Sequence, residues 1–297
     1  NNQPGSINMD LTDYTQSQPC VSIRQSDGAL IRSMSQPVTD DGGQELYRTG
    51  TLTISGKGKM EDYDSEDALP WKDYRNDINK IVIEKDVESI GNYAFQECTG
   101  LTSVTFAENS QLESIGANAF DGCTKLKNMT FGENSELKTI GDYAFSGCIY
   151  LGNITIPEGV TSIGNSAFTN CYNFTSIAIP SNVTSIGNSA FSGCIGLNSI
   201  EISNGVKTIN DSAFANCTNL KKVTFADDSQ LQSIRNSAFL KCAHLQNITI
   251  PKSVAYIGDS AFAGCKKLES VIIERETPCQ VGTTIFGDNN EQDTRSK

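Results

Sequence analysis

The sequence predicts an α/β repeat solenoid in which each coil contributes one short strand to a parallel sheet and one short helical turn. A cysteine recurs every 23 or 25 residues, the pattern L-x-x-I-x-I recurs at the same interval, and an A-F-x-x-C motif contains each cysteine. The cysteines of this series are Cys98, Cys123, Cys148, Cys171, Cys194, Cys217, Cys242 and Cys265. A fixed period of this length indicates stacked units that share one elongated core.

The composition predicts a soluble, folded chain. Of the 297 residues, 37% are hydrophobic and 20% are charged, and no apolar run reaches the roughly 18 residues of a membrane-spanning helix. The 35 acidic and 23 basic residues give a net charge of -12, which would repel nucleic acids and anionic membranes. Because the chain opens with polar residues, we expect that any signal peptide has been removed.

The repeats divide the chain into three parts. Residues 78–291 hold nine units of 23–25 residues, and residues 292–297 form a tail. The ninth unit is expected to act as a C-terminal cap, because Asn289 stands where the repeated cysteine would be. The units begin at Ile78, Leu101, Leu126, Leu151, Phe174, Leu197, Leu220, Leu245 and Leu268.

Residues 1–77 do not repeat and are predicted to form a β-rich N-terminal cap. A hairpin is predicted within residues 20–34, with Ser26-Asp27-Gly28 as its turn. Residues 51–54, followed by Pro70-Trp71, are expected to cover the first coil. Such a cover is needed because an open solenoid end exposes both its core and its sheet edge.

Each part of the repeat has a predicted role. The alternation in Ile154-Thr155-Ile156 is typical of a short strand with one buried face, and A-F-x-x-C places Phe and Cys on one face of a helical turn. An Asn or Asp two residues before the alanine is the expected N-cap of that turn, and the glycine before it suggests a positive φ or a close backbone approach. The expected caps are Asn92, Asp142, Asn165, Asn188, Asp211, Asn236 and Asp259.

Three units are longer by two residues. The extra residues fall in the turn after the strand, at 106–112, 131–137 and 225–231, where a short unit has a turn such as 156–160. We expect this longer turn to bulge outward and to leave the strands on either side undisturbed.

The repeat I-x-x-x-A-F-x-x-C-x-x-L, followed by a strand and a Pro-containing turn, resembles the leucine-rich repeat of the BspA-like, Treponema-type surface proteins. The resemblance covers roughly residues 78–290. It implies a curved, right-handed leucine-rich-repeat solenoid, found on secreted or cell-surface proteins of bacteria and some mucosal protozoa and used for adhesion.

The repeated cysteines are predicted to be buried free thiols. Equivalent residues of stacked coils would lie about 5 Å apart with parallel side-chain directions, which favours small hydrophobic residues over disulfides. Paired C-x-x-C ligands for zinc do not occur in the sequence. Cys20 and Cys279 fall in opposite end regions, about 40 Å apart for nine coils, and should not pair with each other.

The sequence predicts no enzyme and no cofactor. The single histidine, His244, occupies a variable position and is expected at the surface, and no second base is available to activate a Ser or Cys nucleophile. The acidic run at 61–67 offers oxygen ligands for calcium, but Asp67 stands where an EF-hand loop needs glycine. A solvated loop is therefore the favoured interpretation of this run.

The first candidate binding surface is the outward side of the stacked strands, which we call the polar ladder. Its short hydroxyl and amide groups suit a protein or a glycan, whereas the alternative is a solvated sheet face shaped by β propensity. The candidate residues are Asn128, Thr130, Asn153, Thr155, Ser176, Ser199, Glu201, Lys222, Thr224, Asn247 and Thr249.

The second candidate surface, the apolar patch, follows the repeated cysteine on three consecutive coils. It consists of Ile149, Tyr150, Tyr172 and Ile195. Contiguous exposed apolar surface marks contact sites, although half-burial of this column is the alternative. Strict strand alternation favours the polar ladder slightly, because it fixes which side chains face outward.

The resemblance and the missing catalytic groups lead to one functional hypothesis. We expect a nonenzymatic, monomeric adhesion module at the cell surface or outside the cell, with host matrix proteins or glycans as partners and no membrane insertion in this segment. A passive structural spacer and a calcium-dependent carbohydrate-binding module are the alternatives.

Overall fold

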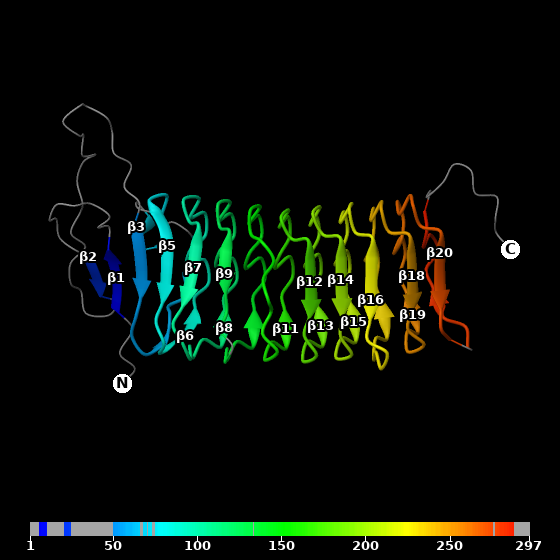
Figure 1. Cartoon of the computed structure of the whole chain (residues 1–297), viewed down its shortest axis with the longest axis horizontal. Helices are drawn as coiled ribbons and strands as arrows, with labels where there is room; N and C mark the ends of the chain where they lie inside the picture. Colours follow the sequence, from blue (N-terminus) through cyan, green and yellow to red (C-terminus); the bar gives the residue numbers. More distant parts are fainter. Residues whose placement is uncertain are drawn as a thin grey trace, which may run out of the picture.

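The chain folds into a parallel-strand β-solenoid of about nine turns. The structure is a computed structural model that describes residues 6–10, 21–24, 50–65, 68–69, 71–72, 75–132, 134–275 and 277–287. Figure 1 shows the coils side by side along the long axis, in sequence order. We number the coils from the unit that begins at Ile78.

One row of strands, the front strands, comes from the predicted L-x-x-I-x-I pattern. Equivalent residues pair in parallel, as Ile177 pairs with Ile200. These strands are β5 (Ile78–Ile83), β7 (Ser103–Phe106), β9 (Asn128–Thr130), β12 (Ser176–Ile179), β14 (Ser199–Ile202), β16 (Lys222–Phe225), β18 (Asn247–Ile250) and β20 (Ser270–Ile273). The row is interrupted, because β9 and β12 end separate sheets and β16 does not pair with β18.

Coil four is an exception to the predicted strand. Residues 151–156 form no strand, although Ile154 and Ile156 are buried and Thr155 between them is exposed. The alternation therefore sets which side chains face the core even where the backbone does not pair with its neighbours.

A second, continuous sheet runs along the back of the solenoid. Its strands have two to four residues, and each comes after the front strand of its coil in the sequence. These strands were not predicted separately. They are β4 (Gly58–Lys59), β6 (Val87–Ile90), β8 (Ser114–Ile115), β10 (Thr139–Ile140), β11 (Ser162–Ile163), β13 (Ser185–Ile186), β15 (Thr208–Ile209), β17 (Ser233–Ile234), β19 (Tyr256–Ile257) and β21 (Gln280–Val281). All ten belong to one sheet.

The segment before the first repeat forms a further coil. Strand β3 (Gly50–Ile54) pairs in parallel with β5, and β4 pairs in parallel with β6. Strand β1 (Ser6–Asp10) is antiparallel to β3, and β2 (Val21–Arg24) is antiparallel to β1. Strand β2 lies in the first half of the predicted hairpin, whose second half lies outside the described residues.

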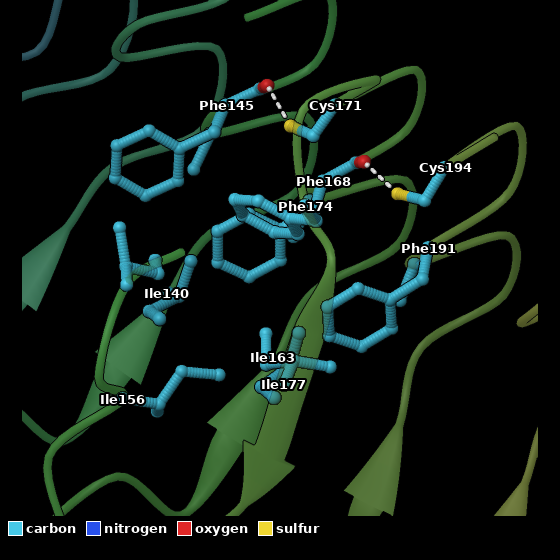
Figure 2. Packing of buried hydrophobic residues seen from close by; sticks show 14 of the residues in the cluster. Ile140, Phe145, Ile156, Ile163, Phe168, Cys171, Phe174, Ile177, Phe191 and Cys194 are labelled. Atoms are coloured by element: carbon cyan, nitrogen blue, oxygen red, sulfur yellow. Dashed lines mark hydrogen bonds between the residues drawn. The ribbon is translucent and has the colours of Figure 1, made fainter. Parts of the chain in front are cut away.

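Stacked aromatic rings run through the core (Figure 2). From Phe95 to Phe262, one phenylalanine per coil stacks on the next with ring centroids 5.2–5.5 Å apart. At the N-terminal end, Trp71 takes the place of the phenylalanine, lies 5.7 Å from Phe95 and donates its indole N–H to Ala94 O. At the other end, Phe286 stacks on Phe262 at 6.3 Å and remains 45% exposed.

The A-F-x-x-C segment is a turn and not a helix. Every second N–H donates to the next coil, as Phe145 does to Ala167 O at 2.7 Å, and Ala144 between these donors bonds three residues back to Gly141. Tyr143 takes a φ of 55°, which an α-helix does not permit. The predicted helical turn and the α/β class were therefore wrong: no α-helix occurs in the described ranges.

The expected N-cap residues have a different role. Their side-chain oxygens accept the backbone N–H of the equivalent residue in the next coil, for example Asn165 N to Asp142 Oδ1 at 2.6 Å. The series begins outside the repeats with Asp62, which accepts from Asn92 N at 2.8 Å. The residue type was predicted correctly, but the N–H that it satisfies belongs to a neighbouring coil.

The glycine before this residue allows the coils to approach closely. A Cβ added to Gly164 would lie 2.5 Å from the backbone N of Asp142, which is closer than real contacts allow. The φ of Gly164 is not positive; the left-handed residue is Ser166, two positions later, with a φ of 52°. Close approach was therefore the correct alternative for this glycine.

The repeated thiols are buried donors. The Sγ of each cysteine from the second coil onward donates to the carbonyl of the phenylalanine in the preceding coil, at 3.1 Å for Cys194 and Phe168 (Figure 2). All eight repeat cysteines are free and buried, as predicted. Cys279 is also free, and Cys20 lies outside the described residues.

The two-residue insertions form turns with a hydrogen bond of their own. In each long turn a serine hydroxyl accepts the backbone N–H two residues later, as Ser110 does from Leu112 at 3.3 Å. Long coils carry Phe at the end of the front strand where short coils carry Ile, so the larger ring accompanies the wider turn. The strands before and after all three insertions are formed, which confirms that the insertion stays within the turn.

We expect the stability of the protein to fall as the pH rises above about 9. Burial raises the pKa of Cys98 and Cys194 to about 12, so the unfolded chain ionises these thiols first and is favoured over the range from about 9 to 12. For each such thiol, the free energy of unfolding should fall by about 1 kcal/mol between pH 9 and pH 10. Denaturant unfolding at both pH values measures this loss, and Cys194→Ala should lose correspondingly less; identical losses in both proteins would contradict the burial.

A second prediction concerns the close approach of the coils. Gly164→Ala should lower the free energy of unfolding by about 2–3 kcal/mol, because the new methyl group meets the backbone of the preceding coil. Gly132→Ala is the matched control, since a Cβ there meets nothing within 4 Å, and should change stability by less than about 1 kcal/mol. Thermal or urea unfolding compares the two; equal destabilisation would show that coil contact is not the cause.

Candidate ligand-binding face and apolar patch

The front strands, and the equivalent segment 151–156 of coil four, place the polar ladder on the outside of the solenoid. Ser199 and Thr224 are half-buried, and the other nine candidate side chains are exposed. Their outward direction follows from strand alternation, because the intervening residues, such as Ile200 and Val223, are buried in the core.

Asn153 has a structural role within this ladder. Its Oδ1 accepts the N–H of Thr175 at 2.8 Å and of Ser176 at 3.3 Å, and its Nδ2 donates to Thr175 Oγ1. The side chain thereby links coils four and five, where front-strand pairing is missing. A change at Asn153 would disturb this link, so Asn153 is unsuitable as a test of ligand binding.

The interruptions of the front row coincide with prolines. At four junctions the residue after the front strand donates its N–H to the last carbonyl of the preceding strand, as Ala226 does to Ile202 O at 3.0 Å. Proline has no N–H and is confined to edge or unpaired positions in a sheet. The three junctions at which the front strands do not pair are those where this residue is Pro157, Pro180 or Pro251.

Hollows lie over two of these proline junctions. The larger, of about 950 Å³, lies between β16 and β18 and includes Phe225 and Pro251 in its lining. The other, of about 430 Å³, is lined by parts of coils four to six, including Ile156 and Pro180. These hollows were not predicted from the sequence, although the spacing of the prolines was a signal for them.

Ladder residues line both hollows. Lys222, Thr224, Asn247 and Thr249 surround the larger one. Asn153, Thr155, Ser176 and Glu201 line the smaller one. Asn128 and Thr130, on β9, line neither of the two, and Ser199 is likewise absent from both linings.

Charged residues at the ends of the larger hollow were not among the candidates. They are Lys221, Lys252, Asp227, Asp228 and Glu274. They come from the residue before β16, from the turns after β16 and β18, and from the residue after β20, so a pattern restricted to the strands does not include them.

The apolar patch is exposed. Tyr150, Tyr172 and Ile195 keep 51%, 40% and 42% of their surface accessible, although each could have been covered by a neighbouring turn. Ile149 is half-buried at the edge of this group. The side chain of Asn173 donates to Tyr150 O at 3.2 Å and holds the backbone of this column between two coils.

Other side chains that could act as catalytic bases or metal ligands have structural roles. His244 is half-buried, not fully exposed as expected, and its Nδ1 lies 2.8 Å from Thr218 O in the preceding coil. In the acidic run, Asp62 accepts from Asn92 and Tyr63 is buried against Trp71.

Within the described ranges, no three His, Cys, Asp or Glu side chains are grouped to hold a metal ion. No helix in those ranges has the length and hydropathy of a membrane span.

Solved structures with this fold come from several bacteria. A leucine-rich repeat protein from Bacteroides ovatus is 26% identical, with a TM-score of 0.60 over 87% of this chain and 68% of its own. The Treponema pallidum leucine-rich repeat protein is 23% identical, with a TM-score of 0.50 over 79% of this chain and 88% of its own. No relative among curated protein sequences matches the chain.

A family model for the BspA type leucine rich repeat region matches residues 73–194 and 161–291. The two matches overlap and together span the repeats from the approach to coil one up to the last coil. The chain therefore belongs to the BspA-type leucine-rich-repeat family.

Proposed function

We propose that this chain is a nonenzymatic interaction module of a secreted or surface-anchored bacterial protein, and that it adheres to a protein partner such as a host matrix protein. The observation that carries the proposal is the exposed apolar patch. Tyr150, Tyr172 and Ile195 are exposed on three consecutive coils, which are joined to their neighbours by backbone hydrogen bonds. Aromatic residues on a rigid scaffold provide contact area at low entropic cost, which is typical of interface anchors.

The leucine-rich-repeat fold itself supports a role in protein interaction. A leucine-rich-repeat solenoid presents extended surfaces and is typically a scaffold for protein interactions. The one histidine of the chain already contacts a backbone carbonyl of the preceding coil. The location outside the cell rests on the family resemblance.

Two alternatives make different predictions. A passive spacer would bind no partner, and a calcium-dependent carbohydrate-binding module would lose its ligand on addition of a chelator. Binding to a panel of purified extracellular-matrix proteins, with and without EDTA, separates both from the proposed protein-binding function.

The binding test uses Tyr172→Ala. For a matrix protein that binds the unmodified chain, we expect the free energy of binding to weaken by about 2 kcal/mol, roughly 30-fold in Kd, because an aromatic anchor at the centre of the patch is lost. Surface plasmon resonance measures the change.

Tyr143→Ser is the matched control. Tyr143 is 46% exposed but belongs to another column, in which the next coil carries Ser166. We expect Tyr143→Ser to bind within twofold of the unmodified chain. If Tyr172→Ala bound equally well while remaining folded by circular dichroism, the patch would not be the contact site.

A further inference from the structure

At the junction between coils seven and eight, the front strands do not pair. Strands β16 and β18 belong to different sheets, and Pro251 cannot supply the N–H that would bond to Phe225 O. At the preceding junction the equivalent bond, from Ala226 N to Ile202 O, is present at 3.0 Å. Phe225 therefore offers an acceptor to the hollow that it lines.

The two proline junctions under the hollows differ in one respect. At the junction of coils four and five, the Asn153 amide fills part of the gap by bonding to Thr175 and Ser176. At the junction of coils seven and eight, the residue equivalent to Asn153 is Lys222, whose ammonium group cannot accept N–H groups of coil eight. The larger hollow is thus left without an asparagine bridge.

The gap does not fit an added strand. Cα atoms of β16 and β18 still approach within 8 Å of each other. A third strand between them would need roughly 9.5 Å, twice the ordinary spacing of about 4.8 Å. Small polar groups can enter this cleft, but an extended polypeptide cannot pair with both edges.

The charges around the cleft balance. Three lysines face three carboxylates, with Lys221 and Lys222 at the start of β16 and Asp227 and Asp228 after its end; the remaining pair is Lys252 and Glu274. A highly charged polymer of either sign would meet as much repulsion as attraction here. Donors, carboxylates and a free carbonyl in one cleft suit groups that both donate and accept hydrogen bonds, such as hydroxyls.

We infer that the cleft between β16 and β18 binds a neutral oligosaccharide. Its volume of about 950 Å³ lies within the range of about 300–1,000 Å³ that is usual for ligand sites. The sugar hydroxyls donate to Phe225 O and to the Asp227 carboxylate, and they accept from the Lys222 and Lys252 ammonium groups. The site is separate from the apolar patch, which lies on coils three to five, and does not depend on the proposed protein partner.

The experiment is a binding screen of the intact chain in the presence of EDTA. The probes are neutral gluco-, manno- and galacto-oligosaccharides, with a sulfated glycosaminoglycan as a separate arm. Isothermal titration calorimetry should detect at least one neutral probe. Binding confined to the sulfated polymer, or no binding at all, would overturn the inference.

Two variants locate the site with that probe. Asp227→Ala should weaken binding at least tenfold, whereas Glu108→Ala, the equivalent carboxylate of coil two, should not, because β7 and β9 pair normally there. Pro251→Ala supplies the missing N–H and should also weaken binding tenfold by closing the cleft; Pro180→Ala, at the Asn153 junction, is its control.

Circular dichroism and thermal unfolding verify that each variant is folded. Asp227 lies in an exposed turn, so a folded Asp227→Ala variant is expected even if Pro251→Ala is unstable. Unchanged binding of both variants would place the sugar elsewhere. Tyr172→Ala should leave sugar binding intact, so failure of the protein-binding proposal can be distinguished from failure of this one.

Discussion

The contact between one coil and the next is the interaction on which the rest of the structure depends. A single coil has no core of its own, and every second peptide group of its A-F-x-x-C turn bonds to a neighbour, as Phe145 does to Ala167. Ring stacking, the thiol of Cys194 on Phe168 O, and Asp142 on Asn165 N repeat this dependence in the side chains. The position of each coil is consequently fixed by its neighbours, which explains why glycine is needed where backbones meet.

The prolines are local exceptions to this rule. Pro157, Pro180 and Pro251 remove one donor each, and the front strands separate at those three junctions while the back sheet remains continuous. A break in one sheet is tolerated because the buried residues remain stacked: Phe168 and Phe191 lie 5.3 Å apart across the junction that contains Pro180. The core therefore supplies stability, and the front face can vary without loss of the fold.

Much of this architecture could be predicted from the sequence because the core follows from periodicity. The eight buried thiols, the inward Ile and Phe residues and the position of the insertions all depend on side-chain type and spacing. The helical turn was predicted wrongly because an Asn or Asp preceded by glycine suits both a helix N-cap and a bond between coils. The choice depends on a neighbour 23 residues away, as for Asn165 N and Asp142. All but one of the back strands have only two residues, which is too short to show the alternation of a strand.

The candidate site was less predictable than the core for the same reason. Exposure of Tyr172 depends on turn conformation, and the bridging role of Asn153 depends on a gap that Pro180 creates in the neighbouring coil. Asn153 and Asn247 occupy the same repeat position and both bond to the next coil, yet Asn153 accepts the backbone N–H groups of Thr175 and Ser176, whereas Asn247 accepts from the Ser270 hydroxyl. Equivalent residues in a repeat therefore share their direction but not the groups to which they bond. Ligand recognition by such a protein is determined by the junctions at which one coil differs from the next.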